Sequence, residues 1–240
     1  MSPGCSEAAR RISFLAAFMV AMATICSCRA AEPVFAIKVK NEINHHPVFS
    51  VFVLPDEELA IEALHNSACE ARAEGGRLTV VNRNQWRYRA PALPGASFLE
   101  ISAPAVTQKM RLGVFVLIPF AKLEDEYLNE YRIGAYPERA LRSERAGNGQ
   151  STYGMPSGFV EVTAENQHTF LTPHFQLKQF LCKQAGAFPK YVVLRERLLL
   201  ALEFILQYVK QAGYRVETLA VLSGYRSPFY NDSIENKAYS

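Results

Sequence analysis

Short apolar runs separated by turn residues recur through the first half of the chain, and they limit the fold more than any other feature. Asn, Gly, Pro or Asp residues bound each run. Short strands with turn signals at such spacing are typical of an all-β sandwich or barrel. We therefore predict a β-sandwich domain over residues 33–121. The runs that carry this prediction cover residues 34–39, 48–54, 78–81, 98–101 and 110–118.

The only tryptophan, Trp86, precedes an Ala-Pro pair and then Pro94-Gly95, just before one of these runs. A large aromatic residue near a proline-rich corner is suited to filling a sandwich core. The arrangement resembles bacterial immunoglobulin-like domains, which implies an immunoglobulin-like sandwich. Such modules more often bind or position than catalyse, and a fold alone does not supply a function.

Residues 1–30 have the pattern of a secretory signal peptide. Two arginines precede an almost wholly apolar run over residues 12–25, which is shorter than the roughly 20 residues of a transmembrane helix. Small residues follow, so we expect cleavage near residues 30–31 and export to the periplasm or cell envelope. Two alternatives stay open. Residues 25–28 loosely resemble a bacterial lipoprotein box with Cys28 as a lipid anchor, and the segment could also remain as an uncleaved N-terminal anchor.

Charge and cysteine content exclude some partners and sites. The net charge of +3 is spread along the chain without a basic block, so we expect no nucleic-acid binding. Cys69 and Cys182 lie in different predicted domains, which favours two separate thiols over a disulfide. Adjacent His45 and His46 would point to opposite faces of a strand, so they are not expected to bind one ion together.

A charged, tyrosine-bearing segment over residues 122–158 predicts an exposed connector, with the domain boundary near residues 140–158. Residues 159–240 then begin a second domain. A short strand is predicted at 159–162, and Thr172-Pro173 is expected to cap a helix over residues 174–181.

A longer helix is predicted from Tyr191 to Ala212, with Gly213 as a C-terminal cap and a buried strand at residues 218–222 after it. Charged residues, Glu203 and Lys210 among them, are expected on the solvent side. Apolar residues at helical spacing define the expected core side: Leu194, Leu198, Ala201, Leu202, Ile205, Leu206 and Val209.

The loop after this strand reads Ser223-Gly224-Tyr225-Arg226-Ser227-Pro228, with Asn231 close behind. A guanidinium held at a strand end is well suited to binding a carboxylate, because its planar fork matches two oxygens.

The loop follows a long leucine-rich helix, and His174-Phe175-x-Leu177-Lys178-x-Phe180 precedes that helix. This order closely resembles the zinc D-alanyl-D-alanine carboxypeptidase family, which includes bacterial peptidoglycan peptidases and hedgehog-like domains. The resemblance covers residues 159–240 and implies an α+β domain that acts on peptidoglycan peptides. It implies that Arg226 is catalytic, binding a substrate carboxylate or stabilising the oxyanion. Ser223, Tyr225 and Ser227 would shape the substrate-binding loop.

The zinc ligands of that family are absent from the sequence. Neither the His-x-x-Gly-x-Ala-x-Asp run nor the later catalytic Glu and ligand His occurs in the 240 residues. Zinc is expected for the complete family domain, but this chain supports no metal ligand of its own. We therefore expect an incomplete, inactive zinc-peptidase-like domain, poorly folded after about residue 160, with apolar helix surface left uncovered.

Three hypotheses follow from the sequence. The leading one is an exported peptidoglycan metallopeptidase seen without its catalytic end. The second is a non-catalytic cell-envelope protein that binds through the β-sandwich. The third is an exported two-domain protein in which Arg226 forms a structural salt bridge.

Overall fold

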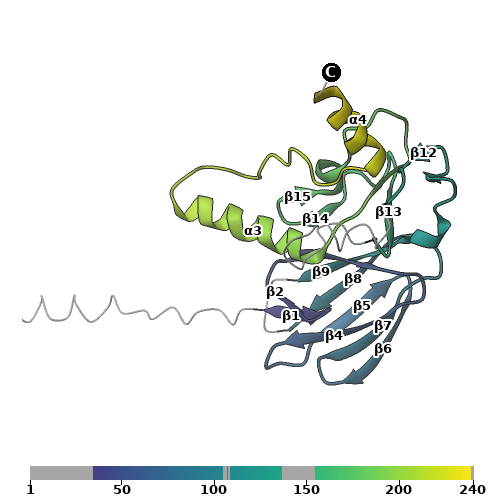
Figure 1. Cartoon of the computed structure of the whole chain (residues 1–240). Helices are drawn as coiled ribbons and strands as arrows, with labels where there is room; N and C mark the ends of the chain where they lie inside the picture. Colours follow the sequence, from purple (N-terminus) through teal and green to yellow (C-terminus); the bar gives the residue numbers. More distant parts are fainter. Residues whose placement is uncertain (1–34, 105–106, 108, 137–154, 239–240) are drawn as a thin grey trace, which may run out of the picture. The chain divides into compact units, whose positions relative to one another are not determined.

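The computed structural model describes residues 35–104, 107, 109–136 and 155–238, and these form a β-rich α+β fold (Figure 1). Within those ranges no helix has both the length and the apolar character needed to cross a membrane. The predicted signal peptide, Cys28 and residues 137–154 of the predicted connector lie outside the described residues.

The described strands between residues 36 and 116 form two sheets. The first is antiparallel, with strand order β2-β1-β4-β7-β6. The second has the order β3-β9-β8-β5, in which β3 and β9 are parallel and the other neighbours antiparallel. Every predicted run in this region falls on a strand. The strands are β1 (Ala36–Val39), β2 (Glu42–Asn44), β3 (Val48–Val53), β4 (Glu58–Leu64), β5 (Glu70–Glu74), β6 (Arg77–Asn82), β7 (Gln85–Arg89), β8 (Gly95–Ser102) and β9 (Met110–Val116).

Alternation along the strands builds the core between these sheets. On β4, Leu59 and Ile61 are buried while the residues between them are more exposed. Val51 and Leu112 belong to the same buried cluster as Trp86, which fills the core as predicted. Each fully buried side chain of this size contributes roughly 1.5–3 kcal/mol. The arrangement is compatible with a sandwich, and its immunoglobulin-like character stays a prediction.

The strands β3 and β9 are buried on both faces. Phe52 and Phe115 lie opposite each other in the register, and both are almost fully buried. The C-terminal half supplies the cover, because Leu171 and Phe175 join the same buried cluster. Strands covered on both faces have near-continuous apolar sequences, as β3 does. The expectation of poor folding after residue 160 is wrong for these segments, and the division into domains stays a prediction.

A third sheet, of antiparallel strands in the order β10-β13-β16, begins the C-terminal half, and β13 confirms the predicted strand at 159–162. Two hairpins lie between its strands in sequence, β11–β12 before β13 and β14–β15 after it. The bounds are β10 (Ile118–Pro119), a 3₁₀ turn η1 (Phe120–Lys122), β11 (Tyr127–Leu128), β12 (Tyr131–Arg132), β13 (Gly158–Val162), β14 (Phe170–Thr172), β15 (Phe175–Gln176) and β16 (Lys190–Val192).

The helix predicted over residues 174–181 is wrong. The segment forms the second strand of the β14–β15 hairpin and one 3₁₀ turn, η2 (Leu177–Phe180). The backbone N–H of Leu177 donates to the Thr169 carbonyl at 2.9 Å, which ties the chain to the preceding strand. Phe175, Leu177 and Phe180 are all fully buried. Burial in this core therefore outweighs the helix signal of Thr172-Pro173.

The long helix is α3 (Glu196–Gln211), which starts later than predicted because β16 uses the first residues of the segment. Gly213 follows it with φ +91°, and its N–H donates to the Lys210 carbonyl, so the predicted cap is confirmed. The predicted core side is wrong in part. The buried residues are Leu199, Glu203 and Leu206. Leu198, Phe204 and Ile205 are exposed, so α3 carries the uncovered apolar surface that the sequence predicted.

The predicted strand at residues 218–222 is also wrong. This segment is irregular, and Leu222 at its end is exposed. The chain then enters α4 (Pro228–Ala238).

Candidate functional site

The predicted loop leads into α4, and Ser227 caps that helix. The Ser227 Oγ accepts the Tyr230 backbone N–H at 3.2 Å, and Pro228 occupies the first helical position. Ser227 is fully buried, and its hydroxyl donates to Gln184 Oε1 at 2.7 Å. Ser227 therefore fixes where the loop ends and the helix begins.

The strand β12 holds the start of α4 in place. Gln184 Nε2 donates to the Arg132 carbonyl at 3.1 Å, which links β12 to Ser227 through one side chain. The Phe229 backbone N–H donates to the Ile133 carbonyl at 3.0 Å. The Arg132 guanidinium also lies over the Phe229 ring, 4.5 Å from its centroid. The entry to α4 is thus anchored by segments remote from it in sequence.

The middle of the loop packs against the core. The Tyr225 hydroxyl lies 3.0 Å from the Tyr136 hydroxyl. Burial, together with Tyr136, raises the pKa of Tyr225 well above its ordinary value, so this phenol stays neutral. A Cβ on Gly224 would lie 2.7 Å from Phe180 Cδ1 and 2.8 Å from its Cα, so only glycine fits this approach.

Arg226 is exposed to solvent, as is Ser223. Its Nε donates to Ser223 Oγ at 2.9 Å, and this is a contact between neighbours in the loop. In the part of the chain that the structure describes, no carboxylate forms an ion pair with Arg226. Since the bond to Ser223 uses only Nε, the terminal nitrogens can meet an anion in the bidentate geometry that arginine favours.

The predicted site residues therefore separate into two groups. Ser223 and Arg226 contact each other at the surface, whereas Tyr225 and Ser227 point into the protein and hold the loop. The described residues contain no group of three or more His, Cys, Asp or Glu side chains that could hold a metal ion. We assign these residues no hydrolytic step.

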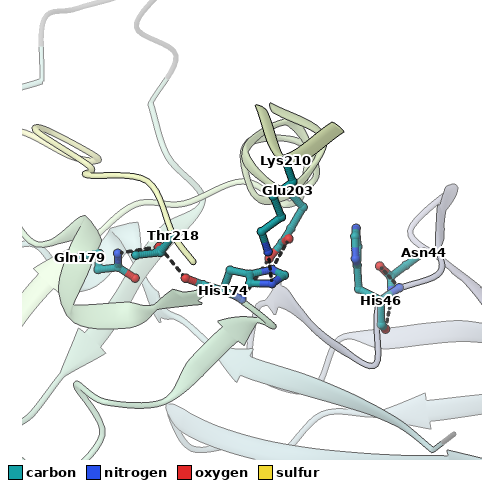
Figure 2. A network of polar contacts seen from close by, with 7 residues as sticks. All are labelled: Asn44, His46, His174, Gln179, Glu203, Lys210 and Thr218. Carbon is teal, nitrogen blue, oxygen red and sulfur yellow. Dashed lines mark hydrogen bonds and ion pairs between the residues drawn. The ribbon is translucent and has the colours of Figure 1, made fainter. Parts of the chain in front are cut away.

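A second polar cluster, which the sequence did not predict, joins α3 to the β14–β15 hairpin (Figure 2). Glu203 is only 2% exposed, and its carboxylate accepts two bonds from His174. The backbone N–H donates at 3.1 Å, and the ring Nδ1 lies 2.8 Å from Oε2. Lys210 Nζ lies 3.0 Å from His174 Nε2. Because lysine can only donate, a hydrogen bond from Lys210 would use Nε2 as the acceptor and leave Nδ1 to donate to Glu203.

The sequence carried one signal of this cluster, a lone acidic residue inside an otherwise apolar stretch of helix. An acidic residue in such a helix is expected on the solvent side, because acidic residues are seldom fully buried unless paired. The partner His174 lies in a segment that is predicted as a helix but forms a hairpin, so helical spacing could not reveal the pairing.

His46 lies beside this cluster and is half-buried, whereas His45 is exposed. Burial lowers the pKa of His46; Glu203 opposes the shift, and His174 and His45 add to it. Protonation is therefore less favourable in the folded state than in the unfolded state.

As the pH falls below the ordinary histidine pKa of about 6.5 toward the lower pKa of the folded state, the free energy of unfolding is expected to decrease. Above about pH 6.5 His46 is neutral in both states, so its titration does not change the free energy of unfolding. Urea denaturation of the wild type and His46→Gln between pH 5 and 8 measures this effect. The free energy of unfolding of His46→Gln should decrease less toward acidic pH than that of the wild type. Parallel curves for the two proteins would contradict a contribution from His46.

Cys69 and Cys182 are free thiols, as the sequence predicted, with Cys182 buried and Cys69 partly buried. Comparisons of the chain with protein-family models, with curated proteins and with solved structures find no match.

Proposed function

We propose that the protein is an exported peptidoglycan peptidase of the D-alanyl-D-alanine carboxypeptidase type, and that this chain, whose sequence lacks the zinc ligands of that family, binds the peptides without cleaving them. Arg226 holds the carboxylate of the peptide, and the loop around it supplies the binding surface. Zinc would belong to the complete family domain, and the chemistry it supplies is activation of water. The residues of this chain bind and orient the substrate.

One observation carries the proposal. The guanidinium of Arg226 has no carboxylate partner among the described residues, and it belongs to a loop that three other residues hold in place. Ser227, Tyr225 and Gly224 each tie the loop to the core. A fixed loop loses little freedom when a ligand binds, so more of the interaction energy appears as affinity. Resemblance in sequence supports the choice of peptidoglycan peptide as the ligand.

The test is binding of an acetylated tripeptide that ends in D-Ala-D-Ala to the full chain, measured by calorimetry and compared with the same peptide as its C-terminal amide. Arg226→Gln should weaken binding of the acid about tenfold or more, because a charge-assisted bidentate pair is lost. Arg226→Lys should give an intermediate loss, since the charge remains but the fork does not.

Arg215→Gln is the matched control, because Arg215 is an exposed arginine in the same irregular segment. Equal binding of acid and amide, or equal losses in the two glutamine variants, would refute the role of Arg226. No released D-alanine is expected from the chain with added zinc, since the family ligands are absent from its sequence. Retention on isolated peptidoglycan without peptide binding would favour the envelope-binding alternative.

A further inference from the structure

A cavity of about 640 Å³ opens between the β3-β9-β8-β5 sheet and the chain around the β14–β15 hairpin. Its volume lies within the range of roughly 300–1,000 Å³ that is usual for small-molecule sites. It is separate in sequence from the Arg226 loop. The lining residues are Val48, Phe98, Arg111, Gly113, His168, Thr169, Phe170 and Pro173.

Strand register explains why the sheet side of the cavity has this composition. Phe98 pairs directly with Gly113, and Val48 pairs with Arg111 two residues along. Paired residues and residues two apart share a face, so all four project from one side of the sheet. Gly113 has no side chain, and a Cβ there would lie 2.9 Å from the Oγ of Ser50, its partner on β3, so this part of the floor admits only glycine. Arg111 is the one charged residue among those that line the sheet side of the hollow.

Arg111 is held on this side of the hollow without an acidic partner. Its guanidinium carbon lies 4.0 Å from the centroid of the Phe98 ring, which fixes the group by a cation–π contact. The cross-strand neighbour Glu100 instead binds Lys109, at 2.7 Å. No ion pair to Arg111 occurs among the described residues. The planar fork is therefore open to a carboxylate.

The described residues of the opposite wall include no acidic side chain. Phe170 is 47% exposed although it is a large apolar side chain. His168 lines the cavity, and its Nδ1 lies 3.3 Å from Lys178 Nζ. The ammonium group of Lys178 therefore adds a second positive charge close to the cavity. The cavity thus combines two aromatic rings with positive charge from two sides.

We infer that this cavity binds an N-acylated amino acid or peptide end, with its carboxylate on Arg111 and its apolar side chain between Phe98 and Phe170. A carboxylate gains charge-assisted hydrogen bonds from the guanidinium. The apolar part of the ligand removes the exposed ring of Phe170 from water. This site does not depend on the function proposed for Arg226.

The experiment compares N-acetylphenylalanine with N-acetylphenylalaninamide on the full chain, by calorimetry and by ligand-observed NMR. The acid should bind at least tenfold more tightly than the neutral amide. Arg111→Gln should weaken the acid about tenfold and leave the amide unchanged. Phe170→Ala should weaken both ligands by a similar factor, because it removes apolar contact alone.

Arg72→Gln is the matched control, because Arg72 lies on β5 of the same sheet with its side chain 84% exposed. No binding by the wild type, equal binding of acid and amide, or equal losses in Arg72→Gln and Arg111→Gln would overturn the inference. Inorganic phosphate is added as a competitor. Displacement of the acid by phosphate at equal concentration would also overturn it, since it would indicate a general anion site. Arg226→Gln should leave this binding unchanged, which separates the two sites.

Discussion

Replacing Glu203 by alanine is expected to lower the free energy of unfolding by about 3 kcal/mol, measured by urea denaturation at pH 7. The carboxylate is buried and accepts both the backbone N–H and the ring Nδ1–H of His174. Alanine would leave these donors without an acceptor at the junction of α3 and the hairpin. Unmade bonds of this kind cost more than the bond itself contributes.

Two further variants separate hydrogen bonding from charge. Glu203→Gln keeps an acceptor oxygen of the same shape, so a smaller loss is expected than for alanine. Glu217→Ala removes an exposed carboxylate from the segment after α3, and a change within about 0.5 kcal/mol is expected. If Glu203→Ala costs no more than Glu217→Ala, the cluster does not join α3 to the hairpin.

The first half of the fold could be predicted from sequence because local signals decide it. Turn residues mark the ends of the strands, and the predicted apolar runs fall on β1, β3, β6, β8 and β9. The predicted runs did not include β2, β4, β5 or β7. Glu70–Glu74 alternates charged residues with alanine, and its place at the edge of a sheet comes from pairing with β8.

The second half was predicted less well because contacts between distant segments decide it. Around α3 apolar residues occur on nearly every side, so periodicity did not select the buried one. Polar contacts determine which side of α3 is buried. Glu203 binds His174, and Glu196 Oε1 accepts the Phe52 backbone N–H at 3.0 Å. Both acids were expected on the solvent side, and both contact other parts of the fold.

In the candidate site, too, features with a local sequence signal differ from features that depend on contacts between distant segments. Ser-Pro is a common helix start, so the capping of α4 by Ser227 has a local signal, but neither α4 nor this cap was predicted. The role of Gln184, which connects Ser227 to β12, has no local signal. The same holds for Arg111 and Phe98, whose contact depends on the register of β8 and β9. Sequence located the loop, and only the three-dimensional structure gave its supports.

Leu206→Ala is expected to lower the free energy of unfolding by about 2–5 kcal/mol, whereas Ile205→Ala, one residue away, should cost about 1 kcal/mol or less. Leu206 is 1% exposed and belongs to the main buried cluster, so its loss leaves a cavity. Ile205 is 47% exposed, and its loss removes apolar surface that water already reaches.

Phe204→Ala extends the comparison, since this larger side chain is 70% exposed and should also be nearly neutral. All three variants keep good helix formers in α3, so helix propensity contributes little to the difference. Urea denaturation of the three variants measures the contrast directly. A cost for Ile205→Ala as large as that for Leu206→Ala would mean that the apolar stripe predicted from sequence is buried in solution. The orientation of α3 around Glu203 would then be wrong.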